Sequence, residues 1–97
     1  MNNNQFNLPL NGEKVTLTFN FGALKRMRDK LGKDPINMLI TGDYEMLTYV
    51  EAIVTCSSKA TNIEELDPAM MADIVNAFAK SMQKESVAGE SNGNTQY

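Results

Sequence analysis

The side chains best suited to binding a charged partner are basic and lie close together between residues 25 and 33. Six bases stand against one acid over residues 14–33, a balance of +5, whereas residues 34–73 carry eight acids and one base, a balance of −7. A basic cluster can contact nucleic-acid phosphates or the carboxylates of an acidic protein. Within the cluster, Lys25, Arg26 and Lys30 are the residues expected to reach solvent and a partner.

The uneven charge also allows copies of the chain to bind one another. If the basic region of one copy met the acidic region of the next, the contact would be heterologous and would propagate into a ring or a helix. A chain of 97 residues with a polar C-terminus builds only a small core, whose margin of stability self-association would increase. Self-association is therefore expected.

Methionine is the second residue type that indicates a binding surface. Most methionines in helical segments fill irregular gaps in a core, because the thioether side chain is flexible. The alternative is an adaptable apolar groove for a partner helix, for which Met70, beside the stripe of Met71 and Ile74, is the candidate residue. Of the seven methionines, those in expected helices are Met27, Met38, Met46, Met70, Met71 and Met82.

Catalytic and metal-binding chemistry has few residues to work with. The chain contains no histidine and one cysteine, Cys56, so it lacks the commonest general base and cannot form a thiolate zinc site. Glu64, Glu65 and Asp67 lack the ligand spacing of a calcium loop, and the glycines form no phosphate-binding loop. The sequence therefore predicts a protein that is not an enzyme and that uses no cofactor or metal.

Two short segments of alternating apolar residues predict a β-hairpin over residues 5–19. Asn11-Gly12 lies between them and favours a two-residue type I′ turn, because both positions of that turn need a positive φ. The turn pairs Leu10 with Glu13 and places the apolar side chains of both strands on one face. These side chains are Phe6, Leu8, Leu10, Val15, Leu17 and Phe19.

Start and stop signals predict helices at about residues 21–31, 35–41, 44–57 and 68–83. Each begins at a residue that can cap a helix, and two have proline at the first helical position. The signals are the caps Asn20, Asp34, Asp43 and Asp67, the prolines Pro35 and Pro68, and the stops Gly32 and Gly42; Thr61 and Glu64 add the spacing of a capping box.

Apolar residues recur on one side of each expected helix, where they would face the core. Phe21 belongs to the stripe of the first helix and Ile40 to that of the second. Met46 and Leu47 belong to the third, whose apolar residues cover about half of its circumference. The third helix is therefore the expected centre of the core.

Together these elements predict one α+β domain over residues 1–83, in which an N-terminal hairpin packs on three to four helices. A flexible tail is expected over 84–97, because this segment has few large apolar groups.

The longest apolar runs are far shorter than the ~20 residues that span a bilayer, and the N-terminus lacks the layout of a signal peptide. The single cysteine fits a reducing cytoplasm. We expect the protein to stay in the cytoplasm of the cell that makes it.

The segment from Phe19 to Pro35, placed after a short hairpin, resembles the tail assembly chaperones of long-tailed phages that infect Gram-positive bacteria. The resemblance rests on the join between strand and helix at Phe21 to Leu24, the stop at Leu31-Gly32 and the restart at Asp34-Pro35. It extends over about residues 13–80.

The resemblance implies a protein that coats the tape measure protein in the host cytoplasm, keeps its long helical segments soluble and recruits subunits of the major tail tube protein. It also implies absence from the mature virion, and a longer form made by ribosomal frameshifting, whose extension would follow Lys84. Two other hypotheses remain open: a small DNA-binding regulator that uses the basic first helix, and a structural subunit retained in the tail.

Overall fold

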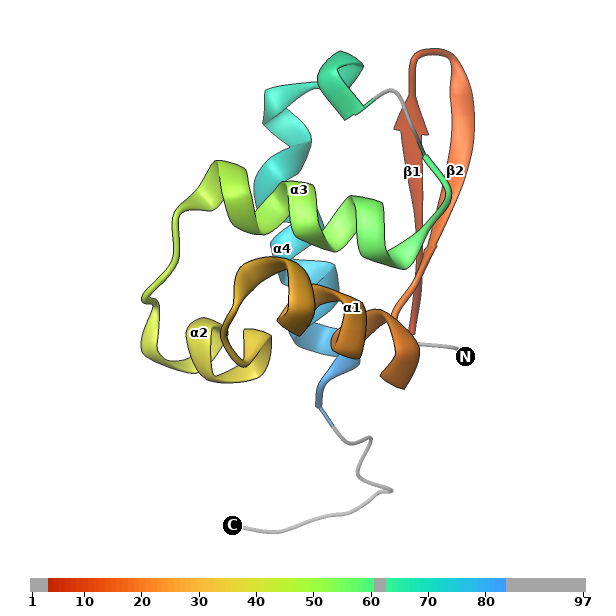
Figure 1. Cartoon of the computed structure of the whole chain (residues 1–97). Helices are drawn as coiled ribbons and strands as arrows, with labels where there is room; N and C mark the ends of the chain where they lie inside the picture. Colours follow the sequence, from red (N-terminus) through yellow and green to blue (C-terminus); the bar gives the residue numbers. More distant parts are fainter. Residues whose placement is uncertain (1–3, 61–62, 84–97) are drawn as a thin grey trace, which may run out of the picture.

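The computed structural model describes residues 4–60 and 63–83. In this part of the chain an antiparallel hairpin of β1 (Gln5–Leu10) and β2 (Glu13–Thr18) is followed by four helices, α1 (Phe21–Leu31), α2 (Pro35–Thr41), α3 (Met46–Ser57) and α4 (Met71–Ser81). Two short 3₁₀ turns, η1 (Ile63–Glu65) and η2 (Pro68–Met70), precede α4. The hairpin lies along one side of the helices (Figure 1). The predicted α+β class and the N-terminal hairpin are confirmed.

The hairpin has the turn and the register that its sequence predicts. Asn11 and Gly12 have φ angles of 52° and 81°, as a type I′ turn requires. Leu10 pairs with Glu13, and Leu8 pairs with Val15. Leu8 is fully buried, so the apolar face of the hairpin rests on the helices, which a two-stranded sheet needs for stability.

The starts of α1 and α2 use the capping residues expected for them. The side chain of Asn20 accepts a hydrogen bond from the backbone N–H of Ala23, 2.9 Å away. Asp34 caps α2 in the same way, directly before Pro35. Both helices end at a glycine with a positive φ, Gly32 and Gly42, where the absence of a Cβ removes the steric cost of that conformation.

The later helices differ from the expectation at their starts. Asp43 does not cap α3, which begins at Met46; Glu45 is the N-cap, and its carboxylate accepts a hydrogen bond from the Thr48 hydroxyl instead of from a backbone N–H. Residues 68–70, expected as the first turn of the last helix, form the 3₁₀ turn η2, because the backbone N–H of Met70 bonds to Asp67 three residues back. The predicted partner Thr61 of a capping box and the predicted tail at 84–97 lie outside the described residues.

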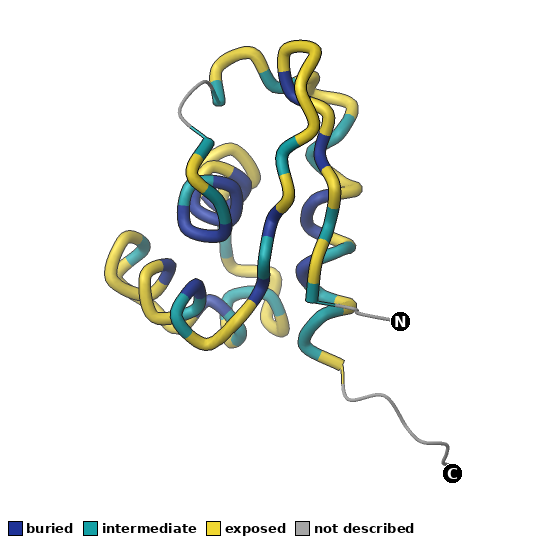
Figure 2. Tube along the Cα trace, turned by 90° about the vertical axis from the view of Figure 1, so that its right-hand side faces the viewer, coloured by how far each residue is buried: buried dark blue, intermediate teal, exposed yellow. Residues whose placement is uncertain are grey.

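Helix α3 forms the centre of the core, as its sequence predicts. Its buried residues face the hairpin, α1 and α4, and Figure 2 shows the buried segments of strands and helices turned toward the interior. The ring of Phe78 from α4 lies edge-on to Phe19, with centroids 5.7 Å apart, and to Tyr49, at 6.0 Å. The buried residues of α3 are Tyr49, Val50, Ala52, Ile53, Val54, Cys56 and Ser57.

Tyr49 links α3 to the short helix α2. Its side chain is fully buried, and its hydroxyl donates a 2.6 Å hydrogen bond to the carbonyl oxygen of Pro35. The ring also stacks on Tyr44, with centroids 4.3 Å apart. Burial raises the pKa of Tyr49 above its ordinary value, and the nearby Tyr44 and Asp34 raise this pKa further.

Replacing Tyr49 by phenylalanine should therefore lower the free energy of unfolding by about 1–2 kcal/mol, because the buried carbonyl of Pro35 loses its donor. The neutral phenol is favoured in the folded state, so its contribution is complete below a pH of about 10 and is lost as the pH rises above that value. Urea unfolding between about pH 9 and 12 should show a steeper loss of stability in the wild type than in Tyr49→Phe.

Tyr44→Phe serves as the control for the stability cost at neutral pH. It removes the hydroxyl of the stacked, half-buried neighbour and leaves the contact between Tyr49 and Pro35 in place, so it should cost less than Tyr49→Phe. Equal alkaline slopes for wild type and Tyr49→Phe would contradict the assigned environment of Tyr49.

Candidate functional site

The four residues predicted to bind a partner do not form one site. Lys25 and Lys30 are exposed on α1, but they lie at different positions around the helix. Met70 is half-buried at the end of η2, on a separate element. Arg26 is also exposed, but its guanidinium is hydrogen-bonded within the molecule. The structure therefore does not gather these four residues into a single site.

Arg26 joins α1 to the end of α3. Its guanidinium donates two hydrogen bonds to the carbonyl oxygen of Cys56, at 3.1 Å from Nε and 2.9 Å from a terminal nitrogen. This carbonyl lies in the last turn of α3, where carbonyl oxygens lack helical partners and where a positive charge is favoured. Arg26 thus has a structural role that its position in a basic cluster did not reveal.

Four large apolar side chains that were expected to face the core are exposed instead. The exposed fractions are 74% for Phe21, 76% for Ile40, 66% for Leu47 and 38% for Met46. Three of them lie in the first turn of α1 or of α3, beyond the part of each helix that packs on its neighbours, and α2 is too short to bury both of its sides. The prediction that their stripes face the core was wrong at these positions.

The first exposed group, which we call the basic patch, consists of Phe21, Ile36 and Ile40 together with Lys25 and Arg28. Phe21, Ile36 and the two bases line a cleft of about 240 Å³ between α1 and the start of α2, which Asp34 also borders. Ile40 lies one turn beyond Ile36 on the same face of α2. The cleft therefore combines apolar walls with positive charge at its rim.

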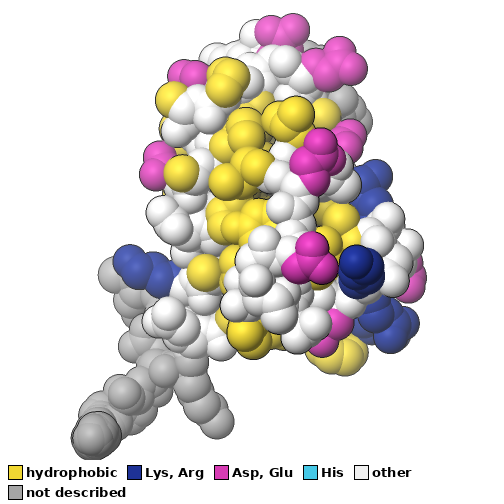
Figure 3. Space-filling model, turned by 90° about the vertical axis from the view of Figure 1, so that its left-hand side faces the viewer, with side chains coloured by type: hydrophobic (Ala, Val, Ile, Leu, Met, Phe, Trp, Pro, Cys, Tyr) yellow, Lys and Arg dark blue, Asp and Glu magenta, His cyan; other side chains and the backbone are white. Residues whose placement is uncertain are grey.

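The second group, which we call the acidic patch, consists of Met46 and Leu47 with Glu45 and Glu51. Leu47 and Glu51 are one helical turn apart, so their side chains share a face of α3. On the side of the molecule where α3 begins, Figure 3 shows a band of apolar side chains bordered by acidic ones, with most basic side chains lower in the view. On this face, most acidic side chains thus lie above most basic ones.

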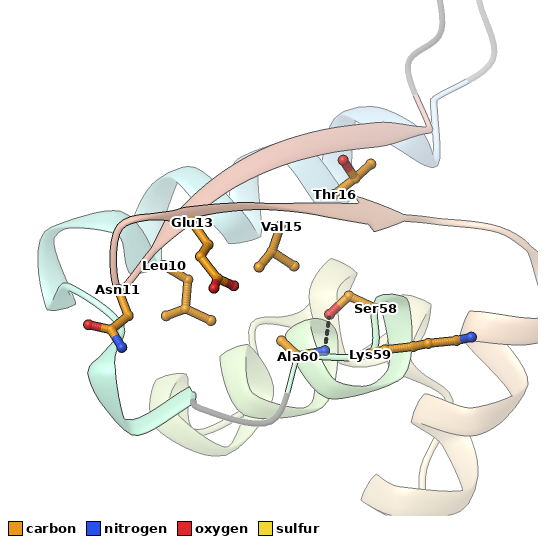
Figure 4. Close-up of a pocket in the computed structure, with 8 residues that line it drawn as sticks. All are labelled: Leu10, Asn11, Glu13, Val15, Thr16, Ser58, Lys59 and Ala60. Carbon is orange, nitrogen blue, oxygen red and sulfur yellow. Dashed lines mark hydrogen bonds between the residues drawn. The ribbon is translucent and has the colours of Figure 1, made fainter.

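Two hollows have properties that fit a small ligand poorly. One, of about 430 Å³, lies between the hairpin turn and residues 58–60; in Figure 4, Thr16 points away from it and Lys59 extends to one side, so its polar groups do not converge. The other lies where α2 meets α3, and Lys33 pairs there with Asp43 at 3.9 Å. Lys30 also borders this second hollow, beside acidic neighbours.

Residues 4–60 and 63–83 contain no group of three acidic, cysteine or histidine side chains that could hold a metal ion. The thiol of Cys56 is buried. No helix in the same residues has both the length and the apolar character needed to cross a membrane. In the part of the chain that the structure describes, the large apolar side chains that are exposed lie in the two patches.

The role of Arg26 can be separated from that of its exposed neighbour Lys25. Arg26→Met keeps the apolar stem and removes both hydrogen bonds to Cys56, so we expect a loss of about 1–2 kcal/mol in the free energy of unfolding. Lys25→Met, which removes the same charge one residue earlier, should change it by less than ~0.5 kcal/mol. Equal effects of the two substitutions in urea unfolding would rule out the structural role.

Comparison with known proteins does not assign the chain to a family. No protein-family model matches it. No curated protein and no solved structure matches it either. The resemblance to tail assembly chaperones therefore stays a prediction that rests on the residues quoted for it.

Proposed function

We propose that this protein is a phage tail assembly chaperone, which binds the tape measure protein in the host cytoplasm and keeps it soluble during tail morphogenesis. In this proposal it also helps to recruit major tail tube subunits, through a longer frameshifted form, and is absent from the mature virion. The observation that carries the proposal is the exposure of Phe21, Ile40 and Leu47, each at least 66%. Exposed apolar groups of this size, here divided between the two patches, mark surfaces that bind other proteins.

The chemistry of a tape measure segment suits such a surface. A long helix with an apolar face binds a groove through side chains at helical spacing, and flexible methionines allow one groove to accept many sequences. Met46 and Met70 lie at the starts of α3 and α4, and both are partly accessible. We assign Met70 to the client-binding surface; Lys25 and Lys30, which lie on a separate element, are proposed as additional contacts with acidic positions of a long client.

The DNA-binding hypothesis has less support from the surface. Helix α3, which would serve as the recognition helix after the α2–α3 junction, is buried along most of its length. Arg26 is bonded to Cys56, and Arg28 lies 3.7 Å from Asp29. A recognition helix must instead present several side chains to the major groove.

Co-expression with the tape measure protein of the same genome tests the proposal. Size-exclusion chromatography with light scattering should show a large soluble complex with many copies per client. Met70→Gln should weaken client binding about tenfold or more, because a buried methionine contributes roughly 1.5–3 kcal/mol at an apolar contact. Ala69→Gln, an exposed position in the same turn, is the matched control and should bind like the wild type.

Either of two results would reject the assignment. An insoluble client beside free chaperone would rule out the chaperone function, and salt-sensitive binding of a DNA duplex by the same protein would then favour the regulator. A soluble complex that Met70→Gln and Ala69→Gln affect equally, with unchanged thermal unfolding, would show that the client binds elsewhere.

A further inference from the structure

We propose that the basic patch of one copy binds the acidic patch of a second copy, so that the molecules associate head to tail. The contact would bring Leu47 and Met46 of one copy into the cleft formed by Phe21 and Ile36 of the next. The inference deepens the proposed chaperone role, because a coat on a client needs contacts between its copies. It is nevertheless tested on the protein alone, so its failure is distinct from a failure to bind the client.

The basic patch has the shape and charge of a receptor. Phe21 stands at the first residue of α1, 74% exposed, and forms one wall of the cleft, while half-buried Ile36 belongs to the facing helix. Lys25 and Arg28 add two positive charges to the lining, and Arg28 also lies 3.7 Å from Asp29 outside it. The one acid there, Asp34, is already used as a cap, since its carboxylate accepts a 3.0 Å hydrogen bond from the N–H of Ile36.

The acidic patch has the properties of the matching insert. Leu47 is 66% exposed in the first turn of α3, and that turn lies at an edge of the molecule (Figure 1). Glu45 and Glu51 flank the apolar pair and are themselves exposed. Docking would bury apolar groups of both patches and place the two carboxylates near Lys25 and Arg28, an arrangement that also favours the correct orientation.

A second copy is favoured as the occupant of the cleft because the two patches are complementary. The basic patch provides a cleft and positive charge, and the acidic patch provides exposed apolar side chains and negative charge. The start of α1 lies on the side of the hairpin and the start of α3 on the opposite side (Figure 1), so one copy cannot cover its own cleft. Different patches meet in such a contact, which leaves one patch of each kind free at the two ends of a dimer. Further copies can add at both ends, as in heterologous assemblies generally.

Two single substitutions test the patches one at a time. Each disrupts one patch and leaves the buried core residues unchanged. Leu47→Lys removes the apolar insert of the acidic patch and allows an ion pair with Glu51, one turn away. Phe21→Glu removes one wall of the cleft and allows an ion pair with Lys25, one turn away. Asn76→Lys on the exposed side of α4 adds a charge outside both patches and is the control. Circular dichroism melting checks that each variant folds.

Sedimentation equilibrium should show that the mass of the wild type and of Asn76→Lys rises with concentration. This rise should weaken when ionic strength increases from about 0.1 M to 1 M, which shortens the screening length from roughly 10 Å to 3 Å. Each patch variant alone should associate at least about tenfold more weakly. An equimolar mixture of the two variants should form a dimer that does not grow, because it joins the one intact patch of each.

Three outcomes would overturn the inference. A wild type that stays monomeric at every concentration rules out self-association. Variants that assemble like the wild type place the contact elsewhere. A mixture that remains monomeric although each variant has lost assembly shows that the two intact patches do not bind each other.

Discussion

The burial of α3 is the constraint on which the rest of this structure depends. A two-stranded hairpin cannot stand alone in water, and α3 is the element against which the hairpin, α1 and α4 each pack apolar side chains. Leu8 and Leu17 cover it from the hairpin, Met27 from α1, and Phe78 from α4. Each of these elements owes its position to contact with one central helix.

The same constraint explains where the exposed apolar groups lie. Seven residues of α3 are buried, but its first turn extends past the helices that cover it, and Leu47 therefore meets solvent. Phe21 projects from the equivalent end of α1, and α2 is held by one face only. A chain this small has too few elements to cover every apolar position, and the uncovered ones define the surfaces available to partners.

Local signals in the sequence predict the fold well because they act over a few residues. Asn11-Gly12 fixes a turn, Asn20 and Asp34 accept hydrogen bonds from the next helical turn, and Gly32 tolerates a positive φ. The candidate surfaces were less predictable, since periodicity assigns Phe21 and Leu47 to an apolar stripe without showing where the neighbouring helix ends. The sequence did contain one signal for these surfaces. The apolar residues of α3 cover about half of its circumference, which is more than one buried face needs. The bond from Arg26 to Cys56 joins residues thirty positions apart, and no local pattern encodes it.

The hydrogen bond between Tyr49 and Pro35 links the cleft between α1 and α2 to the buried core. Pro35 opens α2, the helix that supplies Ile36 and Ile40, while Tyr49 is fully buried in the core. A copy in which this hydrogen bond is broken has lost one of the contacts that hold α2 beside α1. In the proposed assembly, a copy with an intact interior would therefore present a better-formed cleft than a copy whose interior has loosened.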